Sequence, residues 1–328
     1  MPYFLHNKIA NHILSEALSY SLYLTIIGFF IEALYTKNNK PLMFSLIFMF
    51  IVLLTRTQFL FLVAIGIFIA IKNTNRKNLS QSDVAIIVLM AILPIASKLT
   101  DKIYHKLQHE RFVSTPWKGI HLISPAFFVS QPLDVELFNK TDEKTLFQKV
   151  HKELTDKKLN LNSIRTENGK IGSIEIYVEN HTEIANHTIF PAAMKIAPKE
   201  FDRKNKIIYV EKLTTSMLIP LVYNNLKEWV KLNARNFIQG FRDDKILIIL
   251  IIIFVASLVK VIKPNSKPIF TLFLILSFSA IFNMAIVAIG IYTTPRYTFY
   301  NFWVLPMLFI VLFDFFIKNQ NKMNNKNL

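Results

Sequence analysis

Three charged residues, Glu16, Arg56 and Arg296, stand at the edges of apolar segments that otherwise carry little charge. A carboxylate at the end of a membrane span is costly and is often functional, which makes Glu16 a candidate for chemistry. Arginine stays charged and its planar fork fits phosphate oxygens, so Arg56 and Arg296 are candidates for binding a phosphate. The simpler interpretation is that Glu16 reaches water and both arginines extend to lipid headgroups.

Seven apolar segments must position these three residues. The chain is 52% hydrophobic, too apolar for one soluble domain of 328 residues. The segments are 13–34, 41–55, 57–72, 84–99, 246–263, 268–291 and 299–317. The sequence therefore predicts an α-helical integral membrane protein with about seven spans.

Residues 41–72 allow two arrangements. One long span would place Arg56 near mid-membrane, at a cost of several kcal/mol. A hairpin of two short helices would instead place Arg56 at its outer tip and keep the flanking basic clusters on one side. The hairpin is the preferred interpretation.

Basic residues fall in every second gap between the apolar segments, and such residues are retained on the cytoplasmic side. They are Lys37, Lys40, Lys72, Arg76, Lys77, Lys260, Lys263, Lys267, Lys318, Lys322 and Lys326. We therefore expect membrane segments 1–99 and 246–317, an outer soluble insert at 100–245 and a cytoplasmic basic tail at 318–328. Glu16, Arg56 and Arg296 then share the outer face with the insert.

The formal net charge of +16 calls for no nucleic-acid partner, because topology explains most of the excess. The remaining positive charge of the insert suits an anionic lipid surface or a phosphate-bearing substrate, and a solvated face explains it equally well. The chain has no cysteine, which excludes disulfides and thiolate metal sites.

The insert is expected to be α+β. A helix is predicted from Thr141 to Lys158, with Leu146, Phe147, Val150 and Leu154 at helical spacing. Alternating residues predict strands over Gly172–Val178 and Lys206–Glu211.

The insert ends, over roughly Thr214–Phe241, in an amphipathic segment. Its basic row is Lys227, Lys231 and Arg235, and its apolar stripe is Leu226, Trp229, Val230, Phe237, Ile238 and Phe241. One interpretation is a helix on the outer leaflet with Trp229 at headgroup depth, which makes membrane lipid a partner. The other is a helix packed on the core of the insert with a solvated basic face.

Other motifs are weak. His105 and His109 have a spacing that can bind a metal on a helix, but no third ligand accompanies them, so no metal site is predicted. Only seven glycines occur and none forms a phosphate loop. No serine lies in a nucleophile-elbow context.

Four short motifs together resemble the C-type, multi-spanning glycosyltransferases, the superfamily of protein mannosyltransferases and lipid A aminoarabinose transferases. They are Ser15-Glu16 at the start of a span, the basic loop with Lys37 and Lys40, Leu54-Thr55-Arg56 at a span end, and Pro295-Arg296-Tyr297 before the last span. The similarity covers roughly residues 10–72 and 290–312.

The resemblance implies transfer of a sugar, with inversion, from a polyprenyl-phosphate donor to a lipid, glycan or protein acceptor, outside a bacterial inner (plasma) membrane. Arg56, Arg296 and Tyr297 would bind the donor phosphate, and Glu16 is the candidate catalytic carboxylate. No cofactor is identified, and a divalent cation is compatible with this chemistry. The principal base of the family lies in an outer loop after an earlier span, and here the matching region begins only at residue 10. We therefore expect either a truncated or split member, inactive alone, or one whose chemistry is lost or completed by another chain.

Two other functions fit the same pattern. A polysaccharide polymerase or ligase with a large outer loop also relies on outer arginines. A non-enzymatic membrane remnant would use Arg56 and Arg296 as headgroup anchors. A transporter is disfavoured because paired broken helices and midplane charges are not evident.

Overall fold

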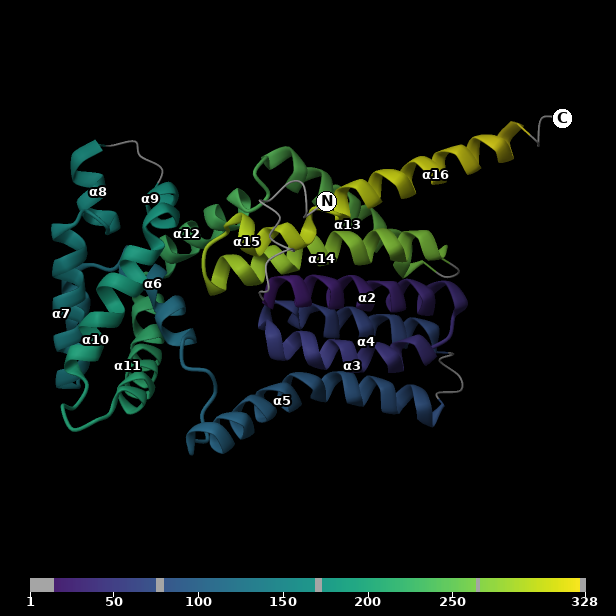
Figure 1. Ribbon diagram of the computed structural model, residues 1–328. Coiled ribbons are helices and arrows are strands. Elements are labelled where there is room, and N and C mark those ends of the chain that lie inside the picture. The colour runs from purple at the N-terminus through teal and green to yellow at the C-terminus, as the bar shows by residue number, and fades with distance from the viewer. Residues whose placement is uncertain (1–14, 75–79, 169–172, 264–265, 325–328) are drawn as a thin grey trace. The chain divides into compact units, whose positions relative to one another are not determined.

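The computed structural model describes residues 15–74, 80–168, 173–263 and 266–324, and all regular structure in these residues is helical (Figure 1). The chain divides into two compact units. Unit 1 comprises the residues up to Thr100, Asp243–Ala285 and the residues from Pro295 onward. Unit 2 comprises Asp101–Arg242 and Ile286–Thr294.

The helices that supply unit 1 begin with three that lie side by side, α2, α3 and α4 (Figure 1). Their bounds, with those of the later elements, are α2 Ser15–Thr36, α3 Lys40–Thr55, η2 Thr57–Leu60, α4 Phe61–Asn73, α5 Gln81–His109, α13 Asp244–Ile262, α14 Pro268–Gly290, α15 Pro295–Thr298, η5 Phe299–Asn301 and α16 Val304–Asn324. Helix α2 buries Tyr23, Ile26 and Phe30 at helical spacing. Leu18 and Leu24, on its other side, stay exposed, as on a helix that contacts lipid.

The helical structure is interrupted at Arg56, so residues 41–72 do not form one continuous helix. Helix α3 ends at Thr55, and Arg56 adopts an extended conformation with φ −153° and ψ 114° before η2 begins. Residues 41–72 therefore form two helices in contact, as the hairpin interpretation requires. The alternative of one long helix is wrong.

The other ends of these helices are joined by polar side chains. The Asn39 amide donates to Asp83 Oδ1 at 2.6 Å, and the Asn73 amide donates to Asn39 Oδ1 at 3.2 Å. Lys72 Nζ donates to Ser266 Oγ at 2.9 Å. Asn39, Lys72 and Asp83 therefore lie at helix ends on one side of unit 1. Arg56 lies at the other end of α3.

Five helices in the described ranges are long and apolar enough to cross a membrane. They are Ser15–Thr36, Gln81–Gln108, Asp244–Ile262, Pro268–Gly290 and Pro295–Ile317. The structure is therefore compatible with a helical membrane protein. Helices α3 and α4 are shorter: the 16 residues of α3 extend about 24 Å at 1.5 Å per residue, below a hydrocarbon core of ~30 Å. Two of the seven expected spans therefore fall short of a full crossing.

Unit 2 is a helical bundle around its own apolar core. Its elements are α6 Lys118–Val129, η3 Pro132–Leu137, α7 Thr141–Asp156, α8 Leu161–Asn168, α9 Ser173–Thr182, the π-helical turns η4 Glu183–Ile189, α10 Phe190–Ile196, α11 Arg203–Asn224 and α12 Leu226–Gln239. The helix predicted from Thr141 is α7, and it buries the expected Leu146, Phe147, Val150 and Leu154. Residues Ile286–Thr294 join this unit through Asn236, whose amide donates to Ala288 O at 2.9 Å.

The α+β prediction is wrong for the described residues, because both expected strands are helices. Gly172 lies outside those residues, and Ser173–Thr182 forms α9, with Tyr177 and His181 buried one turn apart. Lys206–Glu211 lies within α11, whose buried side chains are Val210, Leu213, Thr214, Met217 and Leu221. An alternation of six or seven residues does not separate strand from helix, and the longer segment follows the helical period.

Candidate functional site

Glu16 lies in the first turn of α2 and its carboxylate is fully buried. Its Oε1 accepts from Arg56 Nη2 at 2.5 Å and also from Arg296 Nε. Its Oε2 accepts from Ser15 Oγ at 3.2 Å. Both oxygens of the carboxylate are therefore engaged, and two guanidinium groups from distant segments are held against it.

Tyr297 completes this cluster. Its ring centroid lies 5.4 Å from the guanidinium carbon of Arg56 and 5.9 Å from that of Arg296. Both distances are within the range of a cation–π interaction. The structure thus brings Glu16, Arg56, Arg296 and Tyr297, four residues singled out from sequence, into one site of unit 1, which we call the Glu16 cluster.

A second layer of polar and aromatic side chains supports the cluster. Ser19 lies one turn after Ser15 in α2, and its Oγ is 2.7 Å from Tyr300 Oη, with both side chains buried. The ring of Tyr300 packs edge-on against Phe59 of η2, with centroids 5.0 Å apart. These contacts fasten the start of α2 to η2 and η5, and therefore fix the backbones that carry Arg56 and Arg296.

Two buried donors beside the Arg56 break have no acceptor among the described residues. They are Arg56 Nε and the side-chain amide nitrogen of Gln58, whose residue is only 8% exposed. A buried donor without a partner costs free energy, so such groups commonly await a ligand or water. Gln58, Ser19 and Tyr300 could not be assigned to the site from the sequence, because their roles depend on which segments meet.

The charges of the Glu16 cluster do not cancel. One carboxylate faces two guanidiniums, which leaves one positive charge in excess. Arg56 is 12% exposed and Arg296 is 55% exposed, so solvent and solutes reach the cluster mainly at Arg296. Paired guanidiniums in such a setting can bind phosphate oxygens and stabilise negative charge on a departing phosphate.

The residues of the predicted amphipathic segment lie mainly on helix α12 of unit 2. Trp229 packs partly buried against the apolar core, whereas Leu226 and Val230 are exposed. Lys227 is exposed, Lys231 pairs with Glu228 at 3.0 Å, and Arg235 is exposed. The residues of the predicted apolar stripe therefore do not share one environment. Trp229 packs against the core of unit 2, whereas Leu226 and Val230 are exposed.

Metal-binding side chains do not gather in the described part of the chain. No group of three such side chains occurs there. His105 Nε2 lies 3.2 Å from Thr115 Oγ1 and 3.6 Å from Asp101. The side chain of His109 lies outside the described residues, as do the side chains of the expected tail at 318–328.

Unit 2 buries a pair of imidazoles. The rings of His121 and His181 stack with centroids 5.5 Å apart, and His181 stacks on Tyr292 at 4.3 Å. Burial, with a smaller contribution from His121, lowers the pKa of His181 to about 3, and burial also lowers the pKa of His121. Burial raises the pKa of the adjacent Tyr177. These groups are therefore neutral at physiological pH.

In comparisons with known proteins, no family model, no curated protein and no solved structure matches this chain. In its described residues the chain is an all-helical protein compatible with membrane insertion.

Proposed function

We propose that this protein is a membrane glycosyltransferase-like protein that binds a polyprenyl-phosphate-linked sugar at the Glu16 cluster. The main support for this proposal is that the fully buried carboxylate of Glu16 holds Arg56 and Arg296 side by side, although they come from segments far apart in sequence. The acceptor would be a lipid, a glycan or a protein.

The excess charge and the donors of the cluster favour a phosphate ligand. Arg56 Nε and the Gln58 amide lack acceptors among the described residues, and phosphate oxygens would supply them. Arg296 is the exposed member and would meet the ligand first. When the sugar leaves, negative charge builds on the phosphate, and fixed guanidiniums stabilise that charge without reorganising.

Glu16 acts in this proposal as a positioning residue. Its oxygens accept from Arg56, Arg296 and Ser15, so it is poorly placed to take a proton from an acceptor hydroxyl. We therefore replace its candidate role as a catalytic carboxylate with that of a clamp.

The charge pattern supports an outer location for the site. Glu16 lies in the first turn of α2 and Arg56 follows α3, whereas Lys37 follows α2, Lys40 begins α3 and Lys72 lies in the last turn of α4. Basic loops are retained in the cytoplasm, so the cluster would face outward, in a bacterial inner (plasma) membrane. A polyprenyl-phosphate sugar displayed on that side could reach it.

The test is binding of a polyprenyl phosphate to the full chain in phosphatidylcholine nanodiscs. Arg56→Ala and Arg296→Ala should each weaken binding by about tenfold or more, because each removes a charge-assisted hydrogen bond. Lys40→Ala, at the opposite helix end, is the matched control and should leave affinity unchanged. Equal affinity of the wild type, Arg56→Ala and Arg296→Ala would refute the phosphate role.

The ion pairs of Glu16 with Arg56 and Arg296 also fit a second candidate function, in which the cluster has a purely structural, non-enzymatic role. Glu16 satisfies both arginines internally, and this alone could hold α2, η2 and α15 together. In that case the arginine variants would lower thermal stability, and the wild type would show no affinity for a polyprenyl phosphate.

A further inference from the structure

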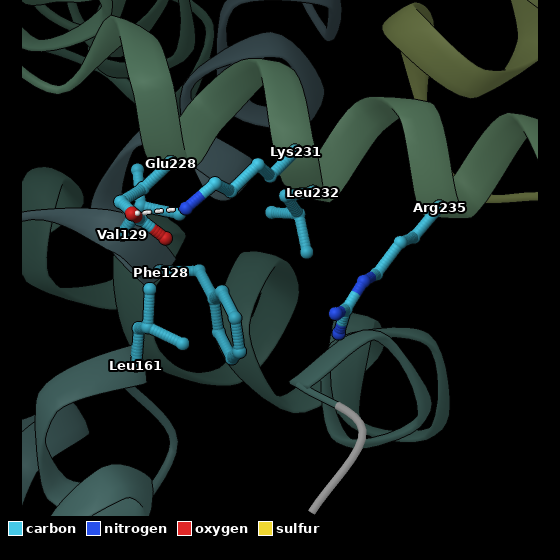
Figure 2. A pocket seen from close by; sticks show the side chains of 7 residues that line it. All are labelled: Phe128, Val129, Leu161, Glu228, Lys231, Leu232 and Arg235. Atoms are coloured by element: carbon cyan, nitrogen blue, oxygen red, sulfur yellow. Dashed lines mark hydrogen bonds and ion pairs between the residues drawn. The ribbon is translucent and has the colours of Figure 1, made fainter.

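Unit 2 contains a cavity of about 140 Å³ against one side of α12 (Figure 2). Its wall is formed by α12, by the last residues of α6 and by the first residue of α8. The lining residues are Phe128, Val129, Leu161, Glu228, Lys231, Leu232 and Arg235. All of them belong to unit 2, so the cavity is independent of the Glu16 cluster.

The floor of the cavity is apolar and its rim is charged. Phe128, Val129, Leu161 and Leu232 are core residues that are almost fully buried. Lys231 and Arg235 lie one turn apart on α12, and Figure 2 shows Arg235 extending on the same side of the helix as Leu232. The cavity therefore offers a hydrophobic base below two cationic groups.

The two cations differ in how they are engaged. Lys231 donates to Glu228 at 3.0 Å, which partly neutralises it. Arg235 forms no hydrogen bond or ion pair with any residue in the described ranges, and it lines the cavity. Glu228, Lys231 and Arg235 together leave one positive charge in excess at the rim.

We propose that this cavity binds a phosphate monoester that carries a short apolar group. The guanidinium of Arg235 suits two phosphate oxygens, Lys231 supplies a second cation, and the apolar floor takes the alkyl part. A cavity of about 140 Å³ has room for a small phosphate ester. This inference does not rest on the proposed glycosyltransferase function.

The phosphate could belong to a soluble ester or to the headgroup of a membrane lipid. Lys227 continues the basic row, and the exposed Leu226 and Val230 lie on the adjoining face of the same helix. A helix with this pattern can rest on an anionic lipid surface, which would bring phosphate headgroups to the rim. Both sources present the same chemistry to Arg235.

The test is titration of the full chain in phosphatidylcholine nanodiscs with n-butyl phosphate, followed by calorimetry. We expect butyl phosphate to bind about tenfold more tightly than inorganic phosphate, because part of the alkyl chain is buried, and butanol not to bind measurably. Arg235→Gln should weaken binding about tenfold or more. Glu228→Gln should strengthen it, since this change releases Lys231 and removes a negative charge.

Lys227→Gln is the matched control, because it removes the same charge from the same helix without touching the cavity lining. Nanodiscs containing phosphatidic acid, compared with phosphatidylserine at equal surface charge, separate the two sources. Weaker apparent binding of butyl phosphate only with phosphatidic acid identifies a lipid, and equal binding identifies a soluble ester; both support the site. Absence of butyl phosphate binding, or equal affinity in the wild type, Arg235→Gln and Lys227→Gln, overturns it.

Discussion

Arg56 Nη2 lies 2.5 Å from Glu16 Oε1, and the carboxylate that it meets is completely removed from solvent. A buried carboxylate is tolerated only when it is paired and hydrogen-bonded, and here Arg296 and Ser15 supply the remaining donors. The pair therefore joins the break after α3 to the first turn of α2.

Glu16→Ala should destabilise the protein by about 3 kcal/mol, because it leaves a largely buried guanidinium at Arg56 without its counter-charge. Thermal unfolding in detergent measures this as a lower midpoint temperature. Glu32→Ala, an exposed position in the same helix, should change stability by less than about 0.5 kcal/mol. Equal midpoints for the two variants would contradict the clamp.

Gln58→Leu should separate stability from binding. The buried amide nitrogen of Gln58 has no acceptor in the described part of the chain, so an apolar side chain of similar size should leave stability unchanged or raise it. Affinity for a polyprenyl phosphate should fall about tenfold if this amide binds the phosphate. Gln81→Leu, at an exposed position, should alter neither quantity, and retained affinity in Gln58→Leu would exclude Gln58 from the site.

The hairpin at Arg56 can be tested with single cysteines, since the chain has none of its own. In sealed vesicles, a membrane-impermeant thiol reagent should modify Asn38→Cys and Thr74→Cys from the same side. This follows from the break at Arg56, which returns α4 toward the helix ends where α3 began. Modification of Asn38→Cys and Thr74→Cys from opposite sides would show instead that residues 41–72 cross once.

Spin labels on α12 would test whether its exposed apolar face meets lipid. A nitroxide at Leu226→Cys or Val230→Cys should relax more with oxygen than with a polar nickel chelate in nanodiscs, because oxygen concentrates in the hydrocarbon. A label at Arg235→Cys, on the cavity side, should show the reverse. Greater access of the nickel chelate at Val230→Cys would place this face in water.

His181 should make unit 2 less stable at mildly acidic pH. Its pKa is about 3 in the folded protein and ~6.5 when unfolded, so between these values the unfolded chain holds a proton that the native chain does not. Its stabilising contribution is complete above pH ~6.5 and falls by about 1.4 kcal/mol per pH unit below it. The rings of His121, Tyr177 and Tyr292 around it offer no negative charge at this pH.

Denaturant unfolding of the wild type and His181→Phe at pH 7 and pH 5 measures this effect. Phenylalanine retains the stacking on Tyr292 but cannot be protonated, so the variant should lose much less stability between the two pH values. An equal loss in both proteins would assign the acid sensitivity to other groups.

Local features of the sequence determined much of the architecture. The lengths of the apolar segments predicted helices close to α2, α3, α4, α13 and α14, and the polar step at Arg56 predicted the break between two of them. The helical spacing of Leu146, Phe147, Val150 and Leu154 predicted the buried face of α7. These signals are local, because a helix satisfies its own backbone hydrogen bonds.

The two strand predictions failed because the segments on which they rested are short. Alternation over Lys206–Glu211 is too short to decide between periods of two and 3.6, and the packing of Val210 and Met217 into the core of unit 2 decided for a helix. Only the tertiary structure settles such short segments, because it shows which side chains are buried together.

The sequence also singled out Glu16, Arg56 and Arg296, because charge at the edge of an apolar segment is costly and therefore visible. It could not show that both oxygens of Glu16 are engaged, or that Tyr300 contacts Ser19 beside the cluster. These facts depend on which helix ends meet. Side-chain types and hydropathy determined the candidates, and the folding of distant segments onto one another decided that Glu16 is a clamp for two arginines.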